Sequence, residues 1–172
     1  MRKITLKELT VFAMLTAVMF LSKLLMEALP NVHLLGMFIV AMTVVYRSKA
    51  LLPIYGYVFL QGLVTGFNIW WMPNLYVWTL LWGMTMLIPR KMPKGVAVVV
   101  YMAVCGLHGF LYGTIWAPAQ ALFFGLGFEG MITWIIAGLP FDLIHGVSNI
   151  ICGTLILPVA TVLSKAEKYA RN

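Results

Sequence analysis

Charged residues are scarce in this sequence. They make up 10% of its 172 residues, whereas hydrophobic residues make up 62%. A chain with so few charges has too little polar surface to cover a water-soluble globule. The scarcity of charge therefore excludes an ordinary soluble domain and predicts an integral membrane protein.

Paired cysteines and common catalytic motifs are also missing. Cys105 and Cys152 fall in apolar stretches without C-x-x-C spacing, so we interpret them as apolar fillers. The chain has no G-x-x-x-x-G-K-S/T motif and so no P-loop for ATP. It also lacks the G-x-S-x-G and H-E-x-x-H motifs. We therefore predict that the chain is not an enzyme and holds no cofactor or metal of its own.

Long apolar runs are what the sequence has in abundance. A hydrocarbon core about 30 Å thick needs about 20 apolar residues per helix, so the chain has room for about six spans. The runs do not alternate with a period of two, which favours helices over barrel strands. The predicted fold is a single-domain, all-α bundle of six transmembrane helices. They span approximately residues 9–28, 34–46, 50–67, 75–89, 95–117 and 131–163.

Local signals predict where helices begin and bend. Thr5 and Glu8 have the spacing of a capping box, in which each residue bonds the backbone of the other, so we expect a helix to begin there. Pro140 and Pro158 predict bends in the long last helix, because proline cannot donate the helical hydrogen bond.

The basic residues predict the orientation of the chain in the membrane. Eleven of the twelve lysines and arginines fall before the first predicted span, between the second and third, between the fourth and fifth, or after the last. The positive-inside rule then places both termini in the cytoplasm. The net charge of +7 follows from this asymmetry, so it implies anionic lipid headgroups rather than nucleic acid as a partner. The eleven residues are Arg2, Lys3, Lys7, Arg47, Lys49, Arg90, Lys91, Lys94, Lys165, Lys168 and Arg171.

Three polar residues interrupt the apolar run of the last predicted span. Asp142, His145 and Asn149 are separated by three and four residues, which puts them on one helix face. Ionisable groups at membrane depth are costly and usually face a bundle interior or a wet cavity. They are either polar contacts between helices or the wall of a ligand pocket. The variety of their chemical groups favours the pocket.

The fifth predicted span carries a second stripe. His108, Tyr112 and Trp116 are four residues apart and share one face. Aromatic stripes also occur in helix cores and in interfacial belts. If this stripe meets the polar face of the last span, the two form a concave site that would stack a flat ring and bond its edges.

Two outer connections are expected to complete this site. Asn68, Trp71 and Trp78 belong to a tryptophan-rich stretch around the third connection, which we interpret as a wall or lid, with an aromatic belt as the alternative. The connection over residues 26–36, which contains His33, is expected to cover the opening of the same site.

Ala13 and Ala17 form a small-x-x-x-small pattern on the first span, which lets another helix approach closely. Together with the six short spans and the stretch P-F-D-L-I-H-G at residues 140–146, this pattern resembles the substrate-binding S component of an energy-coupling factor (ECF) vitamin transporter. Riboflavin-type members carry a similar P-F-D/N-L-I/V-K/H-G stretch. His145 and Asp142 stand where those members often have lysine and asparagine, so the resemblance does not imply riboflavin itself.

The resemblance implies a high-affinity binding subunit in a bacterial or archaeal cell membrane. Such a subunit captures a vitamin-like micronutrient outside and delivers it inward with a membrane T subunit and two cytoplasmic ATPases, which use the ATP. Ala13 and Ala17 would then contact the T subunit. The residues expected to bind the substrate are Asp142, His145, Asn149, His108, Tyr112, Trp116, Asn68, Trp71 and Trp78.

The identity of the solute and two rival classes stay open at this stage. A carboxylate and many aromatic faces favour a flat, donor-rich or cationic ring, unless Asp142 pairs with another group of the protein. An autonomous secondary transporter is the main alternative, although such carriers usually show internal repeats that this sequence lacks. A membrane enzyme using His and Asp as acid and base is a weaker alternative.

Overall fold

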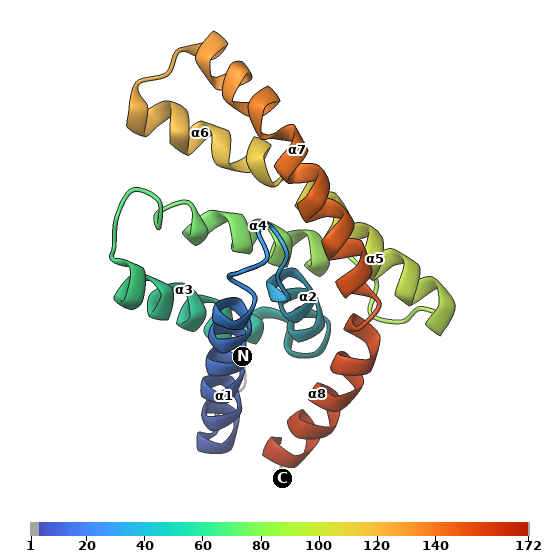
Figure 1. The fold of residues 1–172 in the computed structure, drawn as a ribbon. Coiled ribbons are helices and arrows are strands. Elements are labelled where there is room, and N and C mark those ends of the chain that lie inside the picture. The colour runs from blue at the N-terminus through green and yellow to red at the C-terminus, as the bar shows by residue number, and fades with distance from the viewer. Residues whose placement is uncertain (1–3, 172) are drawn as a thin grey trace.

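The computed structural model describes residues 4–171, which fold into α-helices and one 3₁₀ turn without any strand (Figure 1). The predicted all-α class is confirmed for this part of the chain. The elements are α1 (Leu6–Leu25), α2 (Leu35–Tyr46), η1 (Arg47–Ala50), α3 (Leu51–Thr65), α4 (Asn74–Met86), α5 (Lys94–Phe110), α6 (Tyr112–Phe124), α7 (Phe128–Gly153) and α8 (Ile156–Arg171).

Four helical stretches are long and apolar enough to cross a membrane: Leu6–Leu25, Leu35–Thr65, Lys94–Phe124 and Phe128–Gly153. The second turns sharply at Arg47, whose φ of 56° lies outside the helical region. The third changes direction at Leu111, between α5 and α6. The membrane character of the chain is therefore supported by its helices, while the count of six spans stays a prediction.

The capping box predicted at the start of the first helix is present. The Thr5 hydroxyl accepts the Glu8 amide at 3.1 Å, and the Glu8 carboxylate accepts the Thr5 amide at 2.9 Å. These two bonds satisfy backbone donors that a helix start otherwise leaves unpaired. The helix accordingly begins at Leu6, directly after the cap as the capping box predicts, and three residues before the predicted span.

The predicted spans leave a connection over residues 118–130, and this prediction is wrong for most of that range. Helix α6 continues through Pro118 to Phe124, so the connection shrinks to residues 125–127. Gly125 ends the helix with a φ of 62°, in the left-handed conformation that glycine adopts without steric cost. As a result α6 and the first half of α7 form a hairpin at one end of the molecule (Figure 1).

The predicted last span is also divided differently. Helix α7 runs through Pro140 without a break, and the chain leaves the helix at Thr154 and Leu155 before α8 begins at Ile156. Thr154 lies four residues before Pro158, where the proline ring would clash with a helical carbonyl and supplies no N–H to it. Pro158 therefore separates two helices instead of bending one.

Helix α2 is the buried centre of the bundle. It packs against α1, α4, α5, α7 and α8, and Ile39, Val40, Ala41 and Met42 are completely buried. A helix of 12 residues is about 18 Å long, too short to cross a hydrocarbon core. Its neighbours shelter it from solvent and lipid alike.

The two ends of the chain meet at the same end of the bundle. The Thr5 hydroxyl donates to the Ala170 carbonyl at 3.2 Å, and the Lys7 ammonium lies 5.3 Å from the centre of the Tyr169 ring. Lys49, in the turn after α2, pairs with Glu8 at 2.7 Å. Several of the basic residues thus gather at this end.

Glycines allow α5 and α7 to approach very closely. A Cβ atom added at Gly109 would lie 2.8 Å from the Gly146 Cα atom and 2.9 Å from the His145 carbonyl oxygen. These neighbours are backbone atoms and cannot move aside as a flexible side chain can. The close approach brings His108 of α5 and His145 of α7 into one region of the core.

Candidate functional site

All three histidines of the chain belong to one cluster of packed rings. The rings of His33 and His145 are 4.6 Å apart, and those of Tyr112 and His145 are 4.5 Å apart. Trp78 lies 5.8 Å from His108 and from Tyr112. We call these five residues the ring cluster.

The ring cluster is assembled from five separate parts of the fold. His33 comes from the connection after α1, Trp78 from α4, His108 from the end of α5, Tyr112 from the start of α6 and His145 from α7. The stripes predicted on the fifth and last spans therefore meet, with Tyr112 between the two helices. The connection containing His33 closes over them, as its position in the sequence had suggested.

The connection between α1 and α2 is held down by a polar contact and by burial. The Ser148 hydroxyl of α7 donates to the Asn31 carbonyl at 3.1 Å, and the His33 side chain is 7% exposed. Burial, and then the nearby His145 ring, lower the pKa of His33 to about 3. His33 is therefore a neutral imidazole at physiological pH.

Each imidazole of the ring cluster has a nitrogen without a hydrogen-bond partner. The unpaired atoms are Nδ1 of His33, Nδ1 of His108 and Nε2 of His145. Nε2 of His108 lies 3.1 Å from the Val77 carbonyl oxygen and so must donate to it, which makes Nδ1 of the neutral ring an unused acceptor. Buried polar atoms are normally paired, and such exceptions often mark functional sites.

Grouped imidazoles raise the question of a metal ion. Among residues 4–171, no three histidine, cysteine, aspartate or glutamate side chains converge closely enough to hold one. The histidines approach through ring contacts instead, as the edge-to-face geometry of His33 and His145 shows.

Asp142 belongs to α7 and lies beside the ring cluster, against the start of α6. Its side chain is 5% exposed, and one carboxylate oxygen, Oδ1, accepts the Gly113 amide at 2.9 Å. The other oxygen, Oδ2, has no partner. A Cβ atom at position 113 would lie 2.6 Å from Oδ2, so only glycine leaves room for this oxygen.

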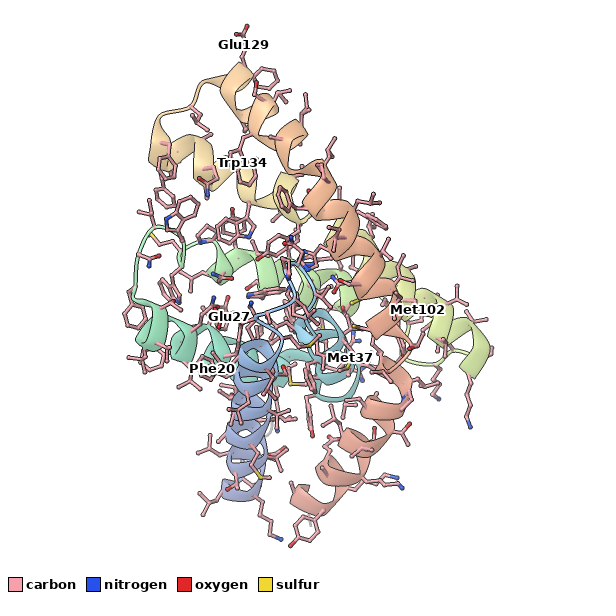
Figure 2. All side chains as sticks on the ribbon, in the orientation of Figure 1. Phe20, Glu27, Met37, Met102, Glu129 and Trp134 are labelled. Carbon is pink, nitrogen blue, oxygen red and sulfur yellow. The ribbon has the colours of Figure 1, made fainter. Side chains whose placement is uncertain are left out.

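Asp142 forms part of the wall of a cavity of about 280 Å³ between α6 and α7. Figure 2 shows the labelled Trp134 in the space between these two helices. Trp70 and Phe141 are more than half exposed and form its rim. The lining residues are Asn31, Trp70, Tyr112, Gly113, Trp116, Gln120, Trp134, Gly138, Phe141 and Asp142.

Three of the residues predicted for the site line this cavity: Tyr112, Trp116 and Asp142. Trp116 also contributes an indole N–H without an acceptor. His108, His145 and Trp78 belong to the ring cluster behind Tyr112, and the Trp78 indole donates to Asn74 at 3.1 Å. These three side chains pack behind the cavity wall and do not line the cavity.

The other predicted residues make contacts within the protein, and only the Oδ1 atom of Asn149 among their polar side-chain atoms described here is buried without a partner. The Asn149 amide group donates to the Cys105 carbonyl at 3.3 Å, so this side chain joins α7 to α5. Asn68 caps a turn by accepting the amides of Trp70 and Trp71. The Trp71 indole donates to the Val58 carbonyl at 2.7 Å. None of the three lines the cavity between α6 and α7.

Gln120 and Trp134 line the cavity but were not predicted. Gln120 comes four residues after Trp116 and extends the stripe of the fifth span by one more turn. Trp134 lies eight residues before Asp142, on the same face of α7. Gln120 would have been found by following its stripe past the expected end of the fifth span, and Trp134 by following the other stripe back through the last span.

No protein-family model, curated protein or solved structure matches this chain.

Proposed function

We propose that this chain binds a small, flat, vitamin-like nutrient in the cavity between α6 and α7. The proposal rests on one observation: a buried carboxylate oxygen, Oδ2 of Asp142, is left without a partner at the wall of a cavity lined by aromatic rings. An unpaired buried acceptor is costly unless a ligand supplies the missing donor. Aromatic walls with a few polar groups are typical of small-molecule sites.

We further propose that the binding protein is the S component of an ECF-type importer. The P-F-D-L-I-H-G stretch that carries the resemblance lies at this cavity, because Phe141 and Asp142 line it and His145 contacts Tyr112. The chain lacks a P-loop, so active uptake would require separate ATPase subunits and a membrane subunit that joins them to this chain.

The first helix offers a surface for that membrane subunit. Ala13 and Ala17 are exposed on α1. Larger exposed side chains on the same helix, such as Met14 and Val18, are apolar. Small residues on an apolar helix surface let a second helix pack closely. We propose this surface as the contact with the T subunit.

Co-purification tests the binding function directly. The full chain is purified in mild detergent and denatured, and the released small molecules are identified by mass spectrometry. We expect one flat heterocycle in stoichiometric amount, which quenches tryptophan fluorescence when it is returned to the ligand-free protein. Purified protein that releases nothing and responds to no heterocycle would contradict the proposal.

Transport assays separate the S component from an autonomous carrier. We expect vesicles that contain this chain alone to bind the solute without accumulating it. Addition of the T subunit and ATPases should start ATP-dependent uptake. Accumulation by the chain alone under an ion gradient would instead identify a secondary transporter.

Substitutions on α1 test the partner surface. Ala13→Leu and Ala17→Leu should block uptake and co-purification of the T subunit without changing solute affinity, because the side chains are exposed and far along the chain from the cavity. Val18→Leu, at an already large exposed residue of the same helix, is the matched control. Loss of binding with intact assembly would contradict this assignment.

A further inference from the structure

Building on the proposed binding function, we infer that the cavity between α6 and α7 selects a flat heteroaromatic cation over neutral and anionic molecules of the same shape. Such a cation carries its charge on a ring nitrogen, either through an alkyl group or through a proton. The charge of the wall, the free oxygen of Asp142 and the aromatic rings each support this choice.

The cavity wall has one charged group and no opposite charge. Asp142 is the acid, and its described lining partners include neither lysine nor arginine. No basic residue among positions 4–171 forms an ion pair with it. Removing an isolated carboxylate from water is costly unless a positive charge lies close to it. A cationic ligand would supply that charge, whereas an anionic ligand would be repelled.

The geometry of Asp142 leaves a position for the cation. Gly113 donates its amide to Oδ1 and, lacking a side chain, leaves room for Oδ2, which has no partner within the protein. A single backbone amide orients the carboxylate but carries no net charge to balance it. The second oxygen therefore keeps an unused capacity to accept an N–H group of the ligand or to balance an alkylated ring nitrogen.

The remaining wall suits a flat cation. Trp70, Trp116 and Trp134 line the cavity together with Tyr112 and Phe141. Cations are attracted to aromatic faces, most strongly to tryptophan. A volume of about 280 Å³ lies near the lower limit for ligand pockets and accommodates a molecule of one or two rings.

Three probes with one two-ring skeleton test this inference. They are the cation 1-methylquinolinium, the neutral 1-methyl-2-quinolone and the anion quinoline-2-carboxylate. Each is titrated into the purified, ligand-free full chain in detergent at neutral pH by isothermal titration calorimetry. We expect the cation to bind at least about tenfold more tightly than the neutral probe, a difference of ~1.4 kcal/mol. The anion should bind most weakly.

Two variants locate the source of the preference. Asp142→Asn keeps an oxygen for the Gly113 amide but removes the charge, so the affinities for the cation and the neutral probe should become about equal. Trp134→Leu should lower cation affinity more than neutral affinity, and it does not depend on how well the Asp142 variant folds. Glu129→Gln removes an exposed carboxylate at the start of α7 and should leave the ratio unchanged.

The possible results separate this inference from the proposed function. Tighter binding of the neutral or anionic probe would overturn the cation preference while leaving a binding protein. An unchanged preference in both Asp142→Asn and Trp134→Leu would overturn this cavity as its source. Binding of none of the three probes by protein that still binds its co-purified solute would overturn the cation preference and leave the proposed function.

Discussion

Two carboxylates in this molecule are almost equally buried but differ in their pairing. Glu8, at the end that carries both termini, is 4% exposed, and Asp142 is 5% exposed. Both oxygens of Glu8 are used, one by the Lys49 ammonium at 2.7 Å and the other by the Thr5 amide at 2.9 Å. Asp142 uses one oxygen for the Gly113 amide and leaves the other without a partner.

The difference indicates what each region is for. Full pairing at Glu8 joins the start of α1 to the turn after α2, so this region holds the bundle together. The unpaired oxygen at Asp142 stabilises nothing within the protein and lies at a cavity. Because an unsatisfied buried acceptor costs free energy, its retention is better explained by binding than by folding.

The largest expected effect comes from removing the partner of Glu8. Lys49→Met leaves a buried carboxylate without its counter-charge and should lower the free energy of unfolding by about 2 to 3 kcal/mol. Unfolding by sodium dodecyl sulfate in mixed micelles measures this loss. Lys165→Met, at an exposed lysine of α8, is the control, and solute affinity should survive in both variants. Equal stability of the two variants would refute the structural role of the pair.

A second substitution tests the glycine contact that brings the ring cluster together. Gly109→Ala places a methyl group against backbone atoms of α7 and should cost about 2 kcal/mol of stability. Solute affinity should fall too, because α5 and α7 must move apart. Gly83→Ala in α4 meets nothing within 4 Å and should instead stabilise the protein by about 0.5 kcal/mol. A neutral effect at Gly109 would argue against the tight packing.

Acidification tests the connection that covers the ring cluster. The pKa of buried His33 is about 3, whereas an unfolded histidine titrates near 6.5, so the unfolded state binds a proton first as the pH falls. Stability is therefore present above pH 6.5 and is lost as the pH falls toward 3. Between pH 7.5 and 5.5 the native protein should lose about 1 kcal/mol more than the His33→Gln variant. The same mixed-micelle unfolding at both pH values measures the difference.

The smallest expected effect concerns Asn68. Substitutions at this residue distinguish a structural role from a binding role. Asn68→Ala removes the acceptor of two turn amides and should cost about 0.5 kcal/mol of stability, at the low end for such caps. Asn68→Asp keeps the acceptor and should be nearly neutral. Solute affinity, measured by tryptophan quenching, should be unchanged in both. A marked loss of affinity would show that Asn68 belongs to the binding site.

Patterns within a few residues of each other predicted the local structure well. The capping box of Thr5 and Glu8, the helical class and the shared face of Asp142 and His145 all depend on contacts between neighbours in the chain. The break before Pro158 was less predictable. Its direct cause, a clash with the carbonyl four residues earlier, is local, but whether a helix bends or ends depends on what surrounds it.

The candidate site was predictable in part for the same reason. Stripes on two helices identified Tyr112, Trp116 and Asp142, which line one cavity. The sequence could not distinguish Asp142 from Asn149, since both are polar residues on one face of the same helix. Each keeps one buried oxygen without a partner, but the Asn149 amide group donates to a carbonyl of α5, whereas Asp142 lines the cavity.

By itself, the sequence determined that this protein is helical and apolar, that its basic residues are grouped, and that acid, imidazole and indole groups recur at helical spacing. Those properties follow from composition and from contacts along one helix. Only the tertiary structure decided which buried polar atoms are paired and where a cavity remains. Pairing depends on atoms that lie far apart in the chain, and a cavity exists only where the packed helices leave space between them.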